Sequence, residues 1–373
     1  MEFNTVYFVF YFLPIVVSIY YLIGYLKPAK YALAWLLICS LFFYSWWNPK
    51  YLILLVTSVL VNFSLSLIMR QYRKFIILTL GIIFNLAIIV YFKYSIFLMQ
   101  TFTLSSTNFT VTQLILPLGI SFFTFQQISY LIDSYRGKVE DYNLLNYSLF
   151  VTFFPQLIAG PIVRQEILLK QFSNPKIASI VKSNFYSGIC VFFIGLFKKA
   201  VLADSIAIYA NPLFNEAYKG ASIGFFEAWL GSLAYTFQLY FDFSGYSDMA
   251  IGLGLLLGIS LPINFNSPFK ARDISEFWRR WHITLSNFIR DYLYSPLTIY
   301  LTRYAMTRRI GNFNIFIVTV AFPILFTFFW MGLWHGAGWT FILFGLIHGI
   351  YLVIHQIWIS AERNLGLSKI LSN

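Results

Sequence analysis

Residues 1–22 read MEFNTVYFVFYFLPIVVSIYYL, and this stretch already indicates the class of protein. Its only charged side chain is Glu2, and a helix that crosses a bilayer needs about 20 largely apolar residues. The stretch has neither the basic n-region nor the small-residue cleavage site of a secretory signal peptide. We therefore interpret it as a first transmembrane helix that stays in the protein.

The composition of the whole chain supports the same interpretation. Of its 373 residues, 59% are hydrophobic and only 11% are charged, whereas a soluble domain carries about 25% charged residues. Lipid must therefore cover much of the surface. The net charge of +12 is placed in short loops between apolar runs, which favours anionic lipid headgroups and argues against nucleic acid. Cys39 and Cys190 both lie in apolar segments, which excludes a disulfide framework and the usual thiolate metal sites.

Apolar runs of spanning length recur along the chain. They cover residues 5–26, 31–48, 51–69, 75–98, 114–132, 185–202, 225–242, 313–334 and 339–360, with interrupted runs at 146–163 and 246–263. The sequence contains no internal repeat, low-complexity tract or linker. We predict a polytopic all-α membrane protein with about nine to eleven membrane helices, forming one domain over residues 1–373.

The charges of the loops predict an orientation. Lys27 and Lys30 lie in the first loop, three basic residues lie in the third (70–74), and the fourth loop (100–113, QTFTLSSTNFTVTQ) is uncharged. Basic loops stay in the cytoplasm. We expect the N-terminus and residues 100–113 outside, with residues 70–74 and 270–309 inside.

The run 146–163, NYSLFVTFFPQLIAGPIV, has basic residues on both flanks and contains helix breakers. Pro155 and the Gly160-Pro161 pair interrupt a helix. Broken backbone at membrane depth is tolerated only where it is buried in protein or lines a cavity. We predict a re-entrant segment beside an internal cavity; the alternative is an ordinary kinked span.

The segment 270–309 is basic and amphipathic. It reads KARDISEFWRRWHITLSNFIRDYLYSPLTIYLTRYAMTRR, and apolar residues recur every three or four positions from Ile274 to Leu293. This period predicts an amphipathic helix at the cytoplasmic interface. Arg279, Arg280 and Arg290 lie largely away from the apolar stripe.

His335 is the strongest candidate for chemistry. It lies in MGLWHGAGW, between two apolar runs, where an ionisable residue indicates function by default. Gly332, Gly336 and Gly338 allow close backbone approach and a helix break. A neutral imidazole there can accept a proton from a hydroxyl. The alternative is a histidine that only packs.

Other polar residues are weaker candidates. His282 follows FWRRW, either as an interfacial histidine or as a second polar group near the site. His348 and His355 are seven residues apart, too far to bind one metal ion, so interhelical hydrogen bonding is expected. Asp242 and Asp248 lie in an apolar run and must find partners or protonate. They could hold a basic residue, polarise a histidine or cap a broken helix.

Five stretches carry a further signal when taken together: LPLGISFFTFQQISYLIDSYRG (116–137), FFPQLIAGPIVR (153–164), YFDFSGYSDMAIGLGLLLGI (240–259), FWRRWHITLSNFIRDYLYSPL (277–297) and GLWHGAGWTFILFGLIHG (332–349). Together, and in this order, they resemble the membrane-bound O-acyltransferase family. The resemblance is to the bacterial branch that includes the alginate and peptidoglycan O-acetylation membrane proteins and the D-alanyl transfer protein of teichoic acid.

The resemblance implies tilted helices around a central tunnel and an acyl thioester delivered from the cytoplasm. It places the family's catalytic histidine at His335 and its second polar histidine at His282. The residues expected to bind substrate are Arg279, Arg280, Trp334, Asp242 and Asp248. Chains of this family usually continue further than the 38 residues that follow His335 here. We therefore expect either a short member of the family or a truncated one, and the role of C-terminal helices in partner docking is in doubt.

We therefore expect a membrane O-acyltransferase in the bacterial cytoplasmic (inner) membrane, surrounded by membrane lipids. The acyl group, expected to be acetyl, would come from acetyl-CoA or an acyl carrier protein as co-substrate, with no bound cofactor or metal. The acceptor would be an extracytoplasmic polysaccharide, or a periplasmic or cell-surface partner protein that acylates it. The alternatives are a transporter or flippase of a lipid-linked saccharide, and a non-catalytic scaffold.

Overall fold

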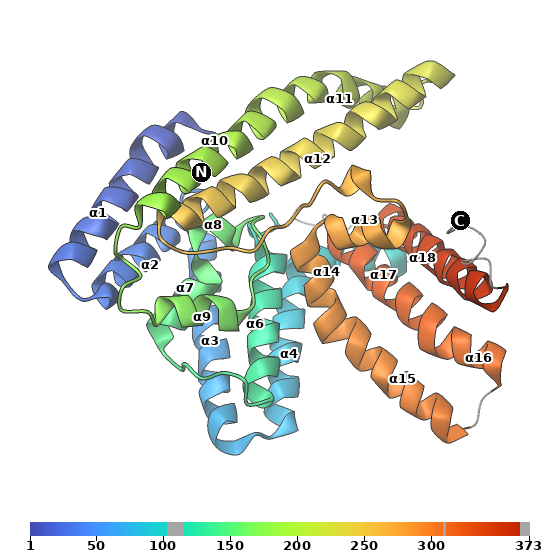
Figure 1. Cartoon of the computed structure of the whole chain (residues 1–373), viewed down its shortest axis with the longest axis horizontal. Helices are drawn as coiled ribbons and strands as arrows, with labels where there is room; N and C mark the ends of the chain where they lie inside the picture. The colour runs from blue at the N-terminus through green and yellow to red at the C-terminus, as the bar shows by residue number, and fades with distance from the viewer. Residues whose placement is uncertain (103–114, 309–310, 366–373) are drawn as a thin grey trace. The chain divides into compact units, whose positions relative to one another are not determined.

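The computed structural model describes residues 1–102, 115–308 and 311–365, and these residues form helices without any β-strand (Figure 1). This confirms the all-α prediction. Most of the loop 100–113, predicted to face outward, lies outside the described residues. Five helices in the described part are long and apolar enough to cross a membrane: Phe8–Leu26, Lys50–Tyr72, Phe75–Phe102, Asn314–His335 and Trp339–Glu362. The protein is therefore a multi-pass membrane protein, while the count of nine to eleven helices stays a prediction.

The chain forms two compact units by its internal contacts. Unit 1 comprises Met1–Ile89 and Leu116–Asn264, and unit 2 comprises Val90–Ile115 and Phe265–Asn373. The α-helices of unit 1 are α1 (Leu13–Leu26), α2 (Ala29–Ser45), α3 (Lys50–Tyr72), α4 (Phe75–Ile89), α6 (Ile120–Tyr135), α7 (Leu144–Thr152), α8 (Phe154–Leu157), α9 (Gln165–Phe172), α10 (Lys182–Phe197), α11 (Asp204–Tyr218) and α12 (Phe225–Leu256). The π-helical segments η1 (Phe8–Phe12) and η3 (Lys198–Ala203) precede α1 and α11.

A buried cluster of polar side chains joins α3, α4 and α6 of unit 1. Asn62, Asn85 and Gln127 are all fully buried. Asn85 donates to Oδ1 of Asn62 at 2.6 Å, Asn62 donates to Oε1 of Gln127, and Ser58 donates to the same oxygen at 3.1 Å. Polar groups that bond across helices in this way hold membrane helices together.

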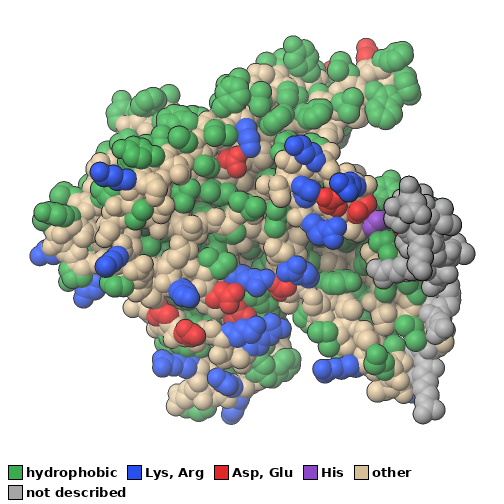
Figure 2. Space-filling model, viewed as in Figure 1, with side chains coloured by type: hydrophobic (Ala, Val, Ile, Leu, Met, Phe, Trp, Pro, Cys, Tyr) green, Lys and Arg blue, Asp and Glu red, His purple; other side chains and the backbone are tan. Residues whose placement is uncertain are grey.

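Helices α10, α11 and α12 run side by side in unit 1 (Figure 1). Hydrophobic side chains dominate the face of these helices shown in Figure 2. Phe193 and Phe197 of α10 and Phe226 and Trp229 of α12 are all exposed. Such an apolar surface fits a lipid environment.

The helix breaks predicted within 146–163 are present. Helix α7 ends at Thr152, Phe153 leaves the helical conformation, and α8 contains Pro155 in its first turn. Residues 158–164 form no helix, in agreement with the Gly160-Pro161 pair. The segment is largely buried inside unit 1. Its re-entrance, and a cavity beside it, stay predictions.

Unit 2 holds the remaining elements. They are η2 (Val90–Tyr94), α5 (Ser95–Phe102), η4 (Pro268–Lys270), α13 (Ile274–Arg280), α14 (Ile283–Ile289), η5 (Arg290–Tyr294), α15 (Ser295–Arg308), α16 (Asn312–Phe316), η6 (Ile317–Ala321), α17 (Phe322–His335) and α18 (Trp339–Leu365). Helices α17 and α18 pack along each other (Figure 1).

The segment from Ile274 to Leu293, predicted from its apolar period to be an amphipathic helix, is helical but interrupted. Helix α13 ends at Arg280, α14 begins at Ile283, and a π-helical segment follows at Arg290. His282 lies at the break with φ of +44°, in the left-handed region. This conformation is uncommon for a residue other than glycine and cannot continue a right-handed helix. The His282 side chain is buried at this break.

Candidate active site

His335 is the last residue of α17, directly before a helix break. Gly336 continues in an extended conformation, and α18 starts only at Trp339. The His335 ring lies 4.8 Å from the ring of Trp334 and 6.0 Å from that of Phe344, between centroids. His335 itself is exposed. The predicted helix break at WHG is confirmed.

His282 is brought to the same place by the break between α13 and α14. Its side chain is only 1% exposed, and its ring lies 6.3 Å from that of Trp334 and 6.5 Å from that of Phe265. Trp334 therefore neighbours both histidines. Burial, reinforced by the proximity of His335, lowers the pKa of His282, so its imidazole is neutral at pH 7.

Two residues that the sequence analysis did not single out also reach this site. Lys93 Nζ donates to the backbone carbonyl of Trp334, and the ammonium lies 5.7 Å from the centroid of the Trp334 ring. The hydroxyl of Tyr94 donates to the carbonyl of Leu333 at 2.8 Å. Both residues come from η2, within the apolar span Phe75–Phe102.

A cavity of about 640 Å³ opens beside α17 within unit 2. Its lining residues are Trp278, Arg279, Ile283, Ser286, Asn287, Ile289, Arg290, Tyr294, Val320, Ile324, Thr327, Phe328, Met331, Leu352 and Gln356. Arg279 and Arg290 supply positive charge, Arg290 while forming an ion pair with Asp291 at 3.0 Å, and most of the other side chains are apolar. The cavity therefore suits an anionic molecule with an apolar arm.

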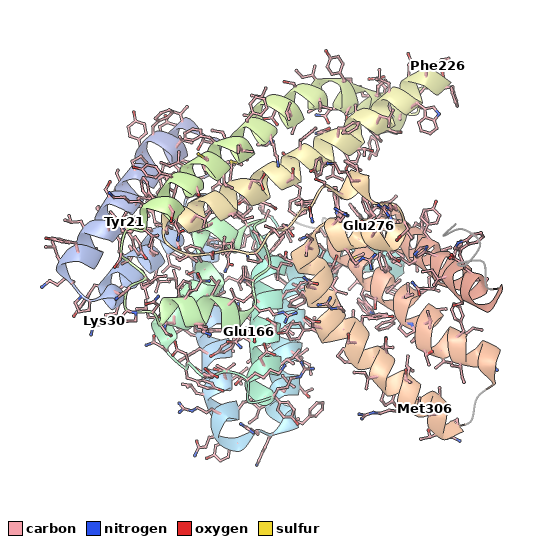
Figure 3. All side chains as sticks on the ribbon, viewed as in Figure 1. Tyr21, Lys30, Glu166, Phe226, Glu276 and Met306 are labelled. Carbon is pink, nitrogen blue, oxygen red and sulfur yellow. The ribbon has the colours of Figure 1, made fainter. Side chains whose placement is uncertain are left out.

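Arg280, the second arginine predicted to bind substrate, is held elsewhere. Its Nε and Nη2 donate to Oε1 of Glu276 at 2.9 and 2.7 Å, and its Nη1 donates to the carbonyl of Asn266 at 3.1 Å. Charged side chains of both signs gather over α13 in Figure 2, and Figure 3 labels Glu276 there. Arg280 thus ties α13 to the preceding loop, whereas Arg279 is exposed and lines the cavity.

Asp242 and Asp248 belong to α12 in unit 1, where both form ion pairs. Asp248 contacts Nζ of Lys198 at 2.5 Å, and Asp242 contacts Nζ of Lys199 at 2.7 Å. Lys199 also contacts Asp204 at 2.7 Å. Of the roles that the sequence left open, holding a basic residue is the one observed. Their predicted contact with substrate stays a prediction.

The two further histidines of α18 have separate surroundings. His348 packs against Phe344 and Trp278, with ring centroids 4.7 and 5.2 Å apart. Nε2 of His355 lies 3.4 Å from Oδ1 of Asp273. Among the described residues, no group of three or more His, Cys, Asp and Glu side chains could hold a metal ion.

Comparison with known proteins identifies the family. The sequence profile of the membrane-bound O-acyltransferase family matches residues 41–367. A peptidoglycan O-acetyltransferase of Helicobacter pylori is 43% identical over 99% of this chain and 73% of the relative. A probable alginate O-acetylase of Pseudomonas putida is 40% identical over 98% of this chain and 72% of the relative. A teichoic acid D-alanyltransferase of Streptococcus thermophilus is 32% identical over 68% of this chain and 60% of the relative. The chain therefore belongs to the membrane-bound O-acyltransferase family and is an acyltransferase.

Proposed function

We propose that this acyltransferase moves an acetyl group from a cytoplasmic thioester, acetyl-CoA or an acyl carrier protein, to a hydroxyl outside the cytoplasm. The acceptor is a cell-envelope polysaccharide, or a periplasmic or cell-surface partner protein that passes the group on. His335 is the general base. The observation that carries the proposal is the position of the His335 imidazole at the end of α17, directly before the helix break, with Trp334 and His282 beside it.

The chemistry requires one proton to move twice. A ring nitrogen of His335 takes the proton of the attacking hydroxyl as its oxygen bonds to the thioester carbonyl carbon. The tetrahedral intermediate then breaks its carbon–sulfur bond, and the imidazolium returns the proton to the departing thiol. Imidazole suits both steps near neutral pH, because its neutral form accepts the proton and the resulting imidazolium gives it up again.

The cavity beside α17 supports a route for the donor. Ile324, Thr327 and Met331 line it, and His335 follows Met331 by four residues. Side chains at steps of three and four residues lie on one face of a helix, so the cavity wall leads along α17 to His335. Arg279 and Arg290 can hold phosphate groups of a coenzyme A or phosphopantetheine donor, since guanidinium groups bind phosphate through paired hydrogen bonds.

The relatives support the class of acceptor. Their names specify peptidoglycan, alginate and teichoic acid, which are polymers of the bacterial envelope and carry hydroxyl groups. This fits a bacterial cytoplasmic membrane location. Membership of an acyltransferase family favours this function over the transporter or flippase that the sequence left open.

The test compares His335→Ala with His355→Ala, a matched variant of a histidine on α18 that lies beside Asp273. Both are expressed in cells that lack the gene, membrane insertion is verified, and O-acetylation of envelope glycans is measured by mass spectrometry. Removal of a general base costs about 10²–10⁴ in rate, so His335→Ala should yield traces of product. A well-inserted His335→Ala protein with wild-type product would refute the assignment.

The donor route has its own test. Arg279→Glu combined with Arg290→Glu should raise the apparent KM for the thioester, because charge reversal repels the phosphates. Arg303→Glu, an exposed reversal on α15, is the control. If the double variant is inserted and shows an unchanged KM, the cavity does not take the donor; if it is lost from the membrane, Arg279→Gln and Arg290→Gln repeat the measurement with a smaller perturbation.

A further inference from the structure

Lys93 and Tyr94 donate hydrogen bonds to two backbone carbonyls in the last turn of α17. The last carbonyls of a helix have no amide partner within that helix, and those of Leu333 and Trp334 belong to the final turn before His335. The hydroxyl of Tyr94 donates to the first of these carbonyls and the ammonium of Lys93 donates to the second. Two consecutive residues of one segment thus hold two consecutive carbonyls of another.

Placing a lysine here is costly, and the cost indicates a role. Lys93 lies inside the apolar span Phe75–Phe102, where charged side chains are rare and mark function. It also lies in η2, a π-helical segment, and such segments recur at functional sites. A positive charge at a helix C-terminus is favourable because it faces the negative end of the helix dipole. The ammonium and the end of α17 therefore complement each other.

We propose that Lys93 and Tyr94 are positioning residues for acyl transfer: they hold the last turn of α17 and thereby fix His335. The inference rests on the proposed role of His335 as the base. His335 is the final helical residue and Gly336 after it is extended, so no continuing helix holds the imidazole in place. The two hydrogen bonds to the preceding carbonyls take over that task.

The expected effect is on the rate of transfer and not on donor binding. Neither residue lines the cavity beside α17, so the apparent KM for the thioester should stay near that of the wild type. A catalytic group misplaced by about 1 Å can lose on the order of 10²-fold in rate. Lys93→Met, which keeps the length and removes the charge, should lower kcat by about 10- to 100-fold. Tyr94→Phe, which removes one hydrogen bond, should lower it by about 3- to 10-fold.

The experiment uses the full chain in lipid nanodiscs, with acetyl-CoA as donor and a soluble envelope oligosaccharide as acceptor. Lys93→Arg tests rescue, because a guanidinium keeps both charge and donor capacity. Tyr91→Phe is the matched control, since Tyr91 belongs to the same segment and is exposed. We expect Lys93→Arg to retain more of the rate than Lys93→Met, and Tyr91→Phe to match the wild type. Should Lys93→Met fail to insert, Tyr94→Phe decides alone.

Double variants separate this inference from the proposed function. If Lys93 acts through His335, Lys93→Met combined with His335→Ala should be no slower than His335→Ala alone, because residues that act as a unit are not additive. Wild-type rates in inserted Lys93→Met and Tyr94→Phe, with His335→Ala inactive, would overturn the inference and leave the base in place. A fall in kcat fully explained by a smaller folded fraction, measured by size exclusion, would also overturn it. An active His335→Ala would instead overturn the proposed function.

Discussion

Gly332, Gly336 and Gly338 bracket His335, and the structure predicts that alanine will affect the three positions very differently. A Cβ atom at Gly332 would lie 2.3 Å from the backbone oxygen of Phe341 and 3.1 Å from Cα of Gly345. At Gly336 it would meet the Phe341 ring at 2.1 Å, and at Gly338 its nearest neighbour would be that ring at 3.7 Å. Only the first contact is with backbone of a packed helix.

The magnitudes follow from these contacts. Alanine at Gly332 gains about 1 kcal/mol in helix propensity, but overpacking typically costs ~1–3 kcal/mol and occasionally more. Because a backbone oxygen at 2.3 Å cannot rotate away, α17 and α18 must separate, and we expect net destabilisation. Phe341 is 43% exposed and its ring can rotate away, so Gly336→Ala should lower the free energy of unfolding by less than Gly332→Ala. Gly338→Ala meets only ordinary van der Waals contacts and should be neutral.

The assay measures, for each variant, the midpoint temperature of thermal unfolding in detergent and the rate of acyl transfer. Gly332→Ala should lower the midpoint and should also lose on the order of 10²-fold in rate, since His335 lies one turn further along α17. Gly345→Ala repeats the test from α18, where a Cβ would lie 2.2 Å from the oxygen of Phe328. Equal stability and rate in Gly332→Ala and Gly338→Ala would refute the close packing on which this reasoning depends.

Three further predictions follow from other parts of the chain. Asp248→Asn should destabilise unit 1 by about 1–3 kcal/mol, less than a fully buried pair because both side chains are about a quarter exposed. Asp242→Asn should destabilise unit 1 less than Asp248→Asn, because Lys199 retains its ion pair with Asp204. Equal losses in the midpoint temperature of thermal unfolding would contradict this. Burial lowers the pKa of His282, so the unfolded chain binds a proton at this residue more readily than the folded chain, and stability should fall as pH drops below about 6.5. His282→Gln should therefore flatten the dependence of the thermal unfolding midpoint on pH between 7.5 and 5.5. An unchanged slope would contradict the burial of His282. With exposed Cys190 replaced by serine, a cysteine at Gln100 should label only from outside and one at Lys74 only from the cytoplasm; the reverse pattern would invert the orientation.

Much of the fold could be predicted because it depends on short-range patterns. Apolar length alone indicates the spanning helices, and the prolines of 146–163 mark the positions where helices cannot continue. The break after His335 was predictable from the glycines around it. In each case the signal and its structural effect lie within a few residues of one another.

What could not be predicted depends on contacts between distant residues. The apolar period from Ile274 to Leu293 contains no sign that His282 adopts a left-handed conformation, because a histidine, unlike a glycine, does not indicate a positive φ. Lys93 did offer a signal, a charge inside the apolar run 75–98. Its partner, the carbonyl of Trp334, lies 241 residues away in the sequence and is a backbone atom that no sequence pattern identifies.

With His335 as the proposed base, its position along α17 would give acyl transfer a direction. The span Asn314–His335 ends at this histidine. At ~1.5 Å per residue a straight helix of this length would place His335 roughly 30 Å from the start of the span, so a span that starts at one membrane surface would bring it near the other. The cavity that Arg279 and Arg290 line contacts α17 from Ile324 to Met331, earlier on the same face. A donor that enters by its phosphates at the arginines would therefore extend its thioester arm toward His335, while an acceptor outside the cytoplasm would need to enter the membrane only a short way. The end of α17 must be held firmly for this arrangement to work, because it is where the two substrates would meet, and this is the end that Lys93 and Tyr94 contact.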